Sequence, residues 1–214
     1  HTNTFYAKKT LVSPKSSSVG EFLFDLFRLA KIRPNQYVAE KLYAAISFDT
    51  GCFRYANVTP HTHYVAGRLL NYKFDFEAIN RRLFDIASLE QLQVETAVIS
   101  AVERYKNNTV TLLTLTRDML KSLGCENVDI DGLSAITRRI EGTIIGITMR
   151  EADDGKIKVS LRSLDDRADV SKIAAVFGGG GHKRASGCVF SCPLPEAKSA
   201  LLGAVFEEWD RIFP

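Results

Sequence analysis

Apolar residues in the first half of the chain recur at helical spacing. Between residues 18 and 31 they fall every three or four positions, which predicts an amphipathic helix, and its many Phe and Leu residues predict that it is largely buried. Ser18, with Glu21 three positions later, forms the sequence pattern of a capping box at its start. A short strand is predicted before it, over residues 6–12, and further helices over residues 35–47, 59–70, 74–86 and 88–107.

The second half of the chain changes in character after residue 108. Residues 109–116 are rich in Thr, Val and Leu and predict a strand, and residues 143–149 and 156–161 predict a hairpin that turns at Asp153-Asp154-Gly155. A further strand is predicted over residues 185–190, and helices are predicted over residues 117–123, 130–140, 169–177 and 194–213. This order of elements predicts a compact α/β domain.

The first half does not have the pattern of a complete domain. A series of helices with one short strand provides no sheet for the helices to cover. We therefore expect residues 1–107 to be the mostly helical C-terminal part of a larger domain, joined through a long helix to a smaller domain over residues 108–214. The predicted fold class is α/β, with a mixed sheet in the second domain.

The composition is that of an ordinary globular protein. Of the 214 residues, 45% are hydrophobic and 25% are charged, and the formal net charge of +3 permits a polyanionic partner without requiring one. No apolar run approaches the roughly 18 residues of a membrane span, so no membrane partner is expected. None of the four cysteines has C-x-x-C spacing, and Cys188 and Cys192 are expected to be free thiols rather than metal ligands. This cysteine usage suits a cytoplasmic protein.

The most informative stretch joins four glycines to three basic residues: Gly178, Gly179, Gly180 and Gly181, then His182, Lys183 and Arg184. Glycine backbones can approach a ligand closely and can curl into an anion-binding nest, so we expect the run to bind phosphate. Its spacing matches neither the Walker phosphate loop nor the dinucleotide-binding fingerprint, and it precedes a predicted strand instead of opening a helix. A flexible turn with solvated basic side chains is the alternative explanation.

Two other short segments carry candidate chemistry. Asp49-Thr50-Gly51 lies where a predicted helix ends in a turn, a usual place for a catalytic or metal-binding carboxylate, although a turn aspartate that caps its own backbone is the commoner case. Arg162-Ser163 ends the predicted hairpin, where a forked guanidinium and a hydroxyl can both reach an anion. An exposed strand end explains that pair about equally well.

Together these segments resemble the DHH phosphoesterase superfamily. Its C-terminal substrate-binding domain carries an S-x-R-S segment and, after a short helix, a G-G-G-G-H-x-x-A-x-G segment, and both occur here in that order, at residues 160–163 and 178–187. The serines at 16–18, Asp49-Thr50-Gly51 with Phe53, and Thr59 before a helix are similar to the region that follows the family's Asp-His-His signature. The resemblance covers nearly all of the chain and lies nearest to the nanoRNase subgroup, which hydrolyses short oligoribonucleotides and 3′-phosphoadenosine 5′-phosphate.

The resemblance implies a hydrolase with two manganese ions, which generate a hydroxide nucleophile and cleave a phosphodiester or phosphomonoester. In that scheme Asp49 is a catalytic residue and metal ligand, and His1 is a candidate further ligand. The residues expected to hold the nucleotide from across the cleft are Arg162, Ser163, Gly178, Gly179, Gly180, Gly181, His182 and Lys183. The expected partners are short RNA oligonucleotides or small nucleotides, with domain closure joining the two half-sites and with pairing as a homodimer.

The family's first metal motifs have no counterpart in this sequence. The resemblance therefore implies a piece of a longer protein, and we expect little or no hydrolase activity from this chain by itself. Two alternatives stay open: a phosphodiesterase acting on linear or cyclic dinucleotides such as pApA and c-di-AMP, and a non-catalytic nucleotide-binding module. A single-strand DNA exonuclease of the same superfamily is less well supported, because only one predicted helix follows the strand over residues 185–190.

Overall fold

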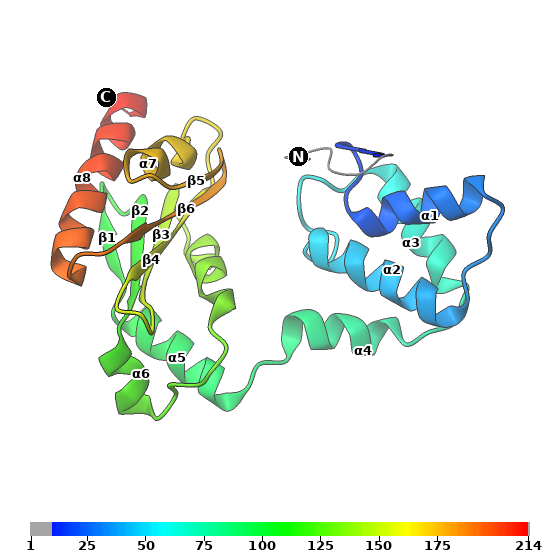
Figure 1. Cartoon of the computed structure of the whole chain (residues 1–214), viewed down its shortest axis with the longest axis horizontal. Coiled ribbons are helices and arrows are strands. Elements are labelled where there is room, and N and C mark those ends of the chain that lie inside the picture. Colours follow the sequence, from blue (N-terminus) through cyan, green and yellow to red (C-terminus); the bar gives the residue numbers. More distant parts are fainter. Residues whose placement is uncertain (1–9, 214) are drawn as a thin grey trace. The chain divides into compact units, whose positions relative to one another are not determined.

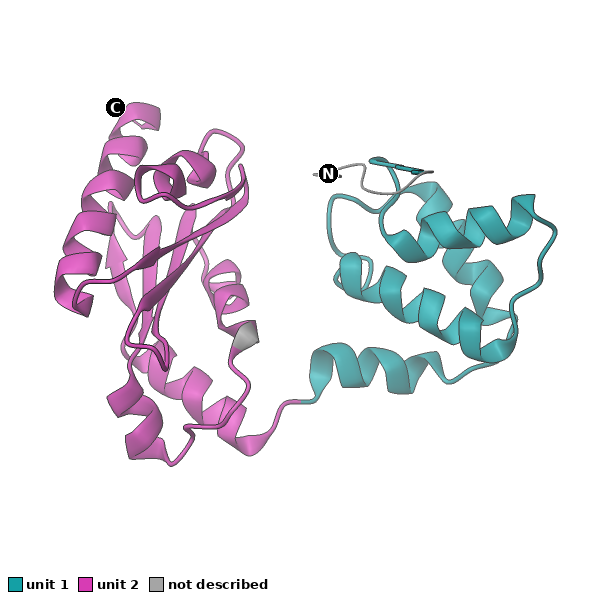
Figure 2. Cartoon of the chain, viewed as in Figure 1, with its two compact units in different colours: residues 1–86 teal, residues 87–214 magenta. Residues whose placement is uncertain are grey.

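The structure, a computed structural model, describes residues 10–213, which divide into two compact units (Figure 2). The first unit ends at Ile86 and the second begins at Ala87. The strand expected over residues 6–12 falls mainly outside the described range, and residues 10–12 form no strand. Within that range, no helix is both long enough and apolar enough to cross a membrane.

The described part of the first unit is helical. Its elements are α1 (Val19–Leu29), α2 (Gln36–Asp49), α3 (Pro60–Leu70), α4 (Phe76–Asn80) and a π-helical turn (Arg81–Asp85) (Figure 1). The first three begin at side-chain caps: Ser18, Asn35 and Thr59 each accept a hydrogen bond from a backbone N–H three residues later. The helices predicted over the first three of these segments are confirmed.

The core of the first unit lies among α1, α2 and α3. Its buried apolar residues are Phe24, Ala39, Leu42, Tyr43, Ile46, Val65, Ala66, Leu69 and Phe74. The expectation that the first helix is largely buried is wrong. Phe24 is its one buried apolar residue in this core, whereas Val19 is 68% exposed and Leu29 is 74% exposed. The helix carries more apolar residues than the positions that face α2 and α3 can cover.

The second unit is a six-stranded mixed sheet with helices on its faces (Figure 1). Along the chain it contains α5 (Leu89–Ser100), β1 (Glu103–Tyr105), β2 (Val110–Leu115), α6 (Arg117–Leu123), a 3₁₀ helix (Asp131–Arg139), β3 (Ile145–Glu151), β4 (Ile157–Ser163), α7 (Val170–Val176), β5 (Gly180–His182), β6 (Ala185–Phe190) and α8 (Leu194–Ile212). The strand order is β1-β2-β3-β4-β6-β5, with β2 and β3 parallel and the other neighbours antiparallel. The predicted α/β class with a mixed sheet is confirmed.

Two cores lie on opposite faces of this sheet. The larger core joins residues such as Ile147 and Leu161 to the apolar sides of α7 and α8. The smaller one packs Leu113 and Leu115 of β2 against α5, α6 and the 3₁₀ helix. Because side chains alternate along a strand, the residues of β4 next to Leu161 point away from the larger core. That alternation decides which predicted site residues can meet.

Three elements of the second unit differ from the sequence predictions. The helix expected over residues 88–107 ends at Ser100, because the chain then forms β1, which pairs with β2. The helix expected over residues 130–140 is a 3₁₀ helix. Part of the glycine run, expected as a loop, is the edge strand β5 paired with β6. The second compact unit also starts before residue 108, because Val94 and Val98 of α5 belong to the core beside β2.

Candidate functional site

One part of the sheet, over β4, β6 and β5, brings two predicted site residues together. Arg162 of β4 is paired with Ala185 of β6, which is paired with His182 of β5. Paired residues of neighbouring strands point to the same face, so the side chains of Arg162 and His182 share a face of the sheet. Two strand spacings, about 10 Å, separate their backbones. Pairing of the strands places these residues in one row although they are distant in the sequence.

The neighbouring row of paired residues on the same face consists of one serine and two glycines. Ser160 of β4 is paired with Gly187 of β6, which is paired with Gly180 of β5. A Cβ atom built on Gly180 would meet no atom within 4 Å, so this strand backbone is accessible to a ligand. We call the surface formed by these rows and the next one the open face. Its residues are Lys158, Ser160, Arg162, Gly180, His182, Ala185, Gly187 and Val189.

Arg162 has the environment of an anion-binding group. Its side chain is half-buried, and its guanidinium donates hydrogen bonds to Ser134 Oγ (3.1 Å) and to the carbonyl of Leu161 (3.0 Å), both uncharged. Burial, and then the nearby positive charge of Arg138, lower the pKa of Arg162. Within the described part of the chain, Arg162 forms no ion pair. Two neighbouring guanidiniums, one without a counter-ion, favour the binding of an anion.

Ser134 and Arg138 were not identified from the sequence as site residues. Both belong to the 3₁₀ helix beside β4, and the basic pair Arg138-Arg139 at its end was the one available signal. A basic pair at a helix end is usually a solvated surface feature or an interaction with the helix dipole. Only the packing of this helix beside β4 shows that Arg138 lies close to Arg162.

Ser163 points away from Arg162, although the two are adjacent in the sequence. It is paired with Ile145 of the larger core and is buried, and its Oγ donates a hydrogen bond to the carbonyl of Asp165 (2.6 Å). The hydroxyl therefore stabilises the turn after β4. The structure does not bring the Ser163 side chain to the open face, and its contact with substrate stays a prediction.

The glycine run takes backbone conformations that favour glycine at two positions. Gly178 has φ +68° where α7 ends, and its N–H donates to the carbonyl of Ala175 (3.1 Å). Gly181 has φ +142°, and a Cβ atom there would lie 2.5 Å from the carbonyl oxygen of Ala185 and 2.6 Å from Ser186 Cα. The run is thus the end of a helix followed by a tightly paired edge strand.

The turn between β5 and β6 connects the glycine run to its neighbours. The carbonyl of Lys183 accepts a hydrogen bond from the N–H of Val170 (3.1 Å), and the carbonyl of Arg184 accepts one from the N–H of Ser163 (3.0 Å). The side chain of Arg184 pairs with Asp166, while the side chain of Lys183 is exposed. Both backbone bonds hold the turn in place next to β4 and the start of α7.

Asp49 is the last residue of α2 and precedes an unusual turn. Gly51, Cys52 and Phe53 all have positive φ, at +56°, +56° and +62°, a conformation that strains the two non-glycine residues. Thr50 is buried and holds the turn, because its Oγ1 donates to the carbonyl of Ile46 (2.6 Å) and accepts from the N–H of Phe53 (3.1 Å). The sequence therefore places a carboxylate directly before a strained, well-fixed turn.

The Asp49 side chain is exposed, yet desolvation by neighbouring protein atoms raises the pKa of its carboxyl. Its carbonyl accepts a hydrogen bond from Asn57 Nδ2 (3.2 Å), and the same Nδ2 donates to the carbonyl of Ser17 (2.9 Å). Asp49 thus lies near the N-terminal end of α1. Because Arg162 and His182 belong to the other unit, the structure does not place Asp49 relative to them.

The described residues do not fit a centre of two manganese ions. Among the side chains that the structure describes, no three of His, Cys, Asp or Glu are grouped so that they could hold a metal ion. Asp49 is the one predicted ligand in that range, and His1 lies outside it. Cys188 and Cys192 are free thiols, as predicted, and burial raises the pKa of Cys188 to about 11. No chemical step through a metal is derived from these residues.

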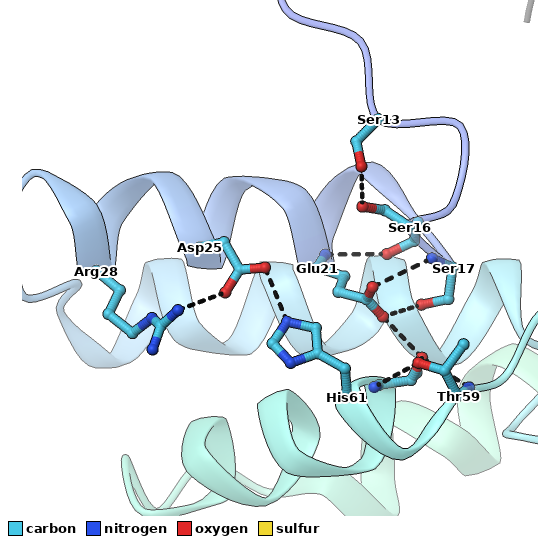
Figure 3. Close-up of polar contacts among 10 residues, drawn as sticks. Ser13, Ser16, Ser17, Glu21, Asp25, Arg28, Thr59 and His61 are labelled. Atoms are coloured by element: carbon cyan, nitrogen blue, oxygen red, sulfur yellow. Dashed lines mark hydrogen bonds and ion pairs between the residues drawn. The ribbon is translucent and has the colours of Figure 1, made fainter.

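A buried polar network joins α1 to α3 near Asp49 (Figure 3). The Glu21 carboxylate accepts hydrogen bonds from Ser17 Oγ (2.5 Å) and Thr62 Oγ1 (2.7 Å), and Glu21 and Thr62 are both buried. Ser18 Oγ accepts from the N–H of Glu21 (3.2 Å), as predicted. The reciprocal half of the predicted capping box is wrong, because the carboxylate contacts Ser17 and Thr62 instead of the N–H of Ser18.

Comparison with known proteins agrees with the two-unit architecture. Residues 107–209 match the sequence model of the DHHA1 domain. The chain therefore contains a DHHA1 domain in its second unit. More closely, it is similar to the bifunctional oligoribonuclease and PAP phosphatase NrnA of Thermus thermophilus, with 31% identity over 214 residues, and to NrnA of Bacillus subtilis, with 28% identity over 185 residues.

These relatives are longer than the chain. The similarity covers 98% of this chain and 63% of the Thermus protein, and 85% of this chain and 58% of the Bacillus protein. Among solved structures, an exopolyphosphatase-related protein from Bacteroides fragilis matches 97% of this chain and 62% of its own length, with a TM-score of 0.87 and 26% identity. The chain therefore spans less than two thirds of each of these proteins.

Proposed function

We propose that the whole protein is a phosphoesterase that hydrolyses short oligoribonucleotides and 3′-phosphoadenosine 5′-phosphate with manganese, and that this chain supplies the surface that binds the nucleotide. The observation that carries the proposal is the placement of Arg162 and His182 in one row of the open face, beside the row of Gly187 and Gly180. The similarity to relatives named as oligoribonucleases and PAP phosphatases supports the same substrate class.

The residues of the open face bind and orient the substrate in this proposal. Arg162 holds a phosphate group, because its half-buried guanidinium has uncharged partners and lies beside Arg138. The glycines let the sugar or base approach the sheet, and His182 contacts the nucleotide from the edge strand. In the whole protein, manganese would supply a metal-activated nucleophile for hydrolysis. We assign Asp49 to that centre as one ligand.

The test is calorimetric titration of the chain with 3′-phosphoadenosine 5′-phosphate and with pApA, without metal. Arg162→Ala is expected to weaken binding by about tenfold or more, because a hydrogen bond to a charged group contributes roughly 1.5–3 kcal/mol. Arg117→Ala is the matched control, since Arg117 is an exposed residue of α6 that pairs with Asp153 and is not one of the open-face residues. Equal affinities of the Arg162→Ala and Arg117→Ala variants would refute the assignment.

Hydrolysis is tested separately from binding. With manganese present, we expect the chain by itself to release little or no mononucleotide from a two-nucleotide or five-nucleotide RNA. Clear release would overturn the expectation of inactivity while leaving the binding proposal intact. A substrate panel of 3′-phosphoadenosine 5′-phosphate, a two-nucleotide RNA, pApA and c-di-AMP distinguishes the proposed activity from a dinucleotide phosphodiesterase in the full-length protein.

A further inference from the structure

A pocket of about 620 Å³ lies in the first unit, at the C-terminal ends of α1 and α3. Four of the side chains that line it are cationic: Arg28, Lys31, Arg33 and Arg68. Aromatic rings form much of the remaining wall: Phe24, Phe27, Tyr64 and Tyr72. The volume suits a small organic molecule of nucleotide size.

The cations around this pocket are only partly neutralised. Arg28 pairs with Asp25 at 3.7 Å, and Asp25 also bonds to His61 Nε2 at 2.8 Å (Figure 3). With the side chains that the structure describes, the other three lining cations form no ion pair. Cations that face one cavity repel one another, so a ligand with several negative charges relieves an unfavourable interaction.

Lys31, one of these four cations, occupies the position where α1 ends in a left-handed residue. It has φ +56° directly after α1, its N–H donates to the carbonyl of Arg28 (3.1 Å), and the N–H of Ile32 donates to the carbonyl of Phe27 (2.9 Å). Helices commonly end with this pattern of hydrogen bonds, and the residue in the left-handed conformation is then usually glycine. Lysine is strained in this conformation. Relative to glycine, it adds an ammonium group that lines the pocket.

The aromatic wall provides a surface on which a base can stack. The side chain of Tyr64 is 49% exposed, and its ring lies nearly parallel to that of His61, with centroids 5.9 Å apart. Exposed rings beside arginines bind nucleotides through base stacking and guanidinium–phosphate contacts together. An inorganic anion would contact the cations but not stack on the rings. A neutral aromatic molecule would stack on the rings but not pair with the cations.

We propose that this pocket binds a free nucleotide that carries more than one phosphate group. The site is distinct from Asp49, which lies near the N-terminal end of α1, whereas the pocket is at the C-terminal end. The 11 residues of α1 separate the two ends by about 16 Å. The proposal does not rest on the proposed function of the open face, because the two sites share no residue.

A purely structural role of two arginines, at the ends of helices, explains part of the positive charge around the pocket. Arg28 and Arg68 lie in the last turns of α1 and α3, where a cation interacts favourably with the helix dipole. That explanation does not cover Arg33, which lies two residues before the N-cap of α2, where the helix dipole does not favour a cation. The test therefore requires variants at Arg33 and at Arg68, with a measurement of folding beside the measurement of binding.

The test titrates ATP labelled with a fluorescent methylanthraniloyl group into the chain that carries Arg162→Ala, so that the open face contributes little. Arg33→Ala and Arg68→Ala are each expected to weaken binding by about tenfold. Arg82→Ala, an exposed arginine of the π-helical turn that does not line the pocket, is the control and is expected to bind as the parent does. Circular dichroism melts identify any variant that loses its fold.

Competition then identifies the ligand chemistry. Unlabelled ATP is expected to displace the probe at lower concentration than AMP or inorganic tripolyphosphate, and Tyr64→Ser is expected to remove the advantage of ATP over tripolyphosphate. Folded Arg33→Ala and Arg68→Ala variants that bind like Arg82→Ala would overturn the proposal. Tripolyphosphate that competes as well as ATP, or binding of a five-nucleotide RNA without binding of ATP, would also overturn it.

Discussion

Gly180 and Gly181 are neighbours in β5, and adding one methyl group to each is expected to have opposite consequences. At Gly181, with φ +142°, the new Cβ would lie 2.5 Å from the carbonyl oxygen of Ala185 and 2.6 Å from Ser186 Cα. Both atoms belong to the backbone of the paired strand and cannot rotate away. At Gly180, the new Cβ meets no atom within 4 Å and points to the open face.

The expected magnitudes follow from these surroundings. Gly181→Ala places a side chain in a sparsely populated backbone region, which costs about 1–3 kcal/mol, and the overlap with β6 adds to this. We expect a loss of about 2–4 kcal/mol in the free energy of unfolding of the second unit. Gly180→Ala is expected to change that free energy by no more than about 0.5 kcal/mol. It should nevertheless weaken nucleotide binding, because its methyl group occupies the space above the sheet.

Trp209 provides the assay. It is the one tryptophan of the chain and lies in α8, where its Nε1 donates to Thr109 Oγ1 (2.8 Å), so its fluorescence during urea unfolding reports the second unit. With a urea dependence of about 2 kcal/mol per M, Gly181→Ala should lower the midpoint by about 1–2 M and leave the slope unchanged. A Gly181→Ala variant with the parent midpoint would refute the pairing of β5 with β6. A Gly180→Ala variant with the parent affinity for 3′-phosphoadenosine 5′-phosphate would refute close approach of the ligand at this strand.

Three further predictions concern other parts of the chain. Glu21→Gln should lower the free energy of unfolding of the first unit by about 1–3 kcal/mol in circular dichroism melts, because a buried carboxylate loses its charge-assisted bonds; an unchanged melt would contradict the network. At pH 8 without denaturant, a thiol reagent should label the half-buried Cys52 before Cys188, whose pKa burial raises to about 11, and rapid labelling of Cys188 would show that its environment is open. Desolvation raises the pKa of Glu103, but hydrogen bonds from Lys198 and a neighbouring tyrosine outweigh it and lower the pKa overall. The ionised Glu103 carboxylate therefore stabilises the folded chain at pH values above its pKa in the unfolded chain, roughly 4.3. This stabilisation is lost as the pH falls through the lower pKa of the folded chain. Glu103→Gln should therefore reduce the acid sensitivity of urea unfolding.

The helices of the first unit were predictable because their start signals are local. Ser18, Asn35 and Thr59 satisfy N–H groups three residues ahead, and such caps are visible in any sequence. The strand β1 was not predictable, because Glu103–Tyr105 directly follows a helix and becomes a strand through pairing with β2. The exposure of Val19 and Leu29 was missed because helical spacing shows which residues share a face, and not whether a neighbour covers it.

The candidate site was predictable in its composition and not in its geometry. The sequence identified Arg162, Ser163 and the glycine run as a group, yet alternation along β4 sends the side chains of Arg162 and Ser163 to opposite faces. Arg138 reaches Arg162 through the packing of the 3₁₀ helix, which no local pattern specifies. The pocket at the ends of α1 and α3 was missed for the same reason, because its residues come from segments far apart in the chain.

The central claim is that the open face binds the nucleotide. Its most direct test is a ¹⁵N–¹H NMR titration of the chain with 3′-phosphoadenosine 5′-phosphate, which reports each backbone amide separately. We expect the largest shifts in the second unit at Arg162, Gly180, His182 and Gly187, and we expect them to be lost in Arg162→Ala. Saturating ligand that leaves these four amides unchanged, while amides elsewhere shift, would contradict the account.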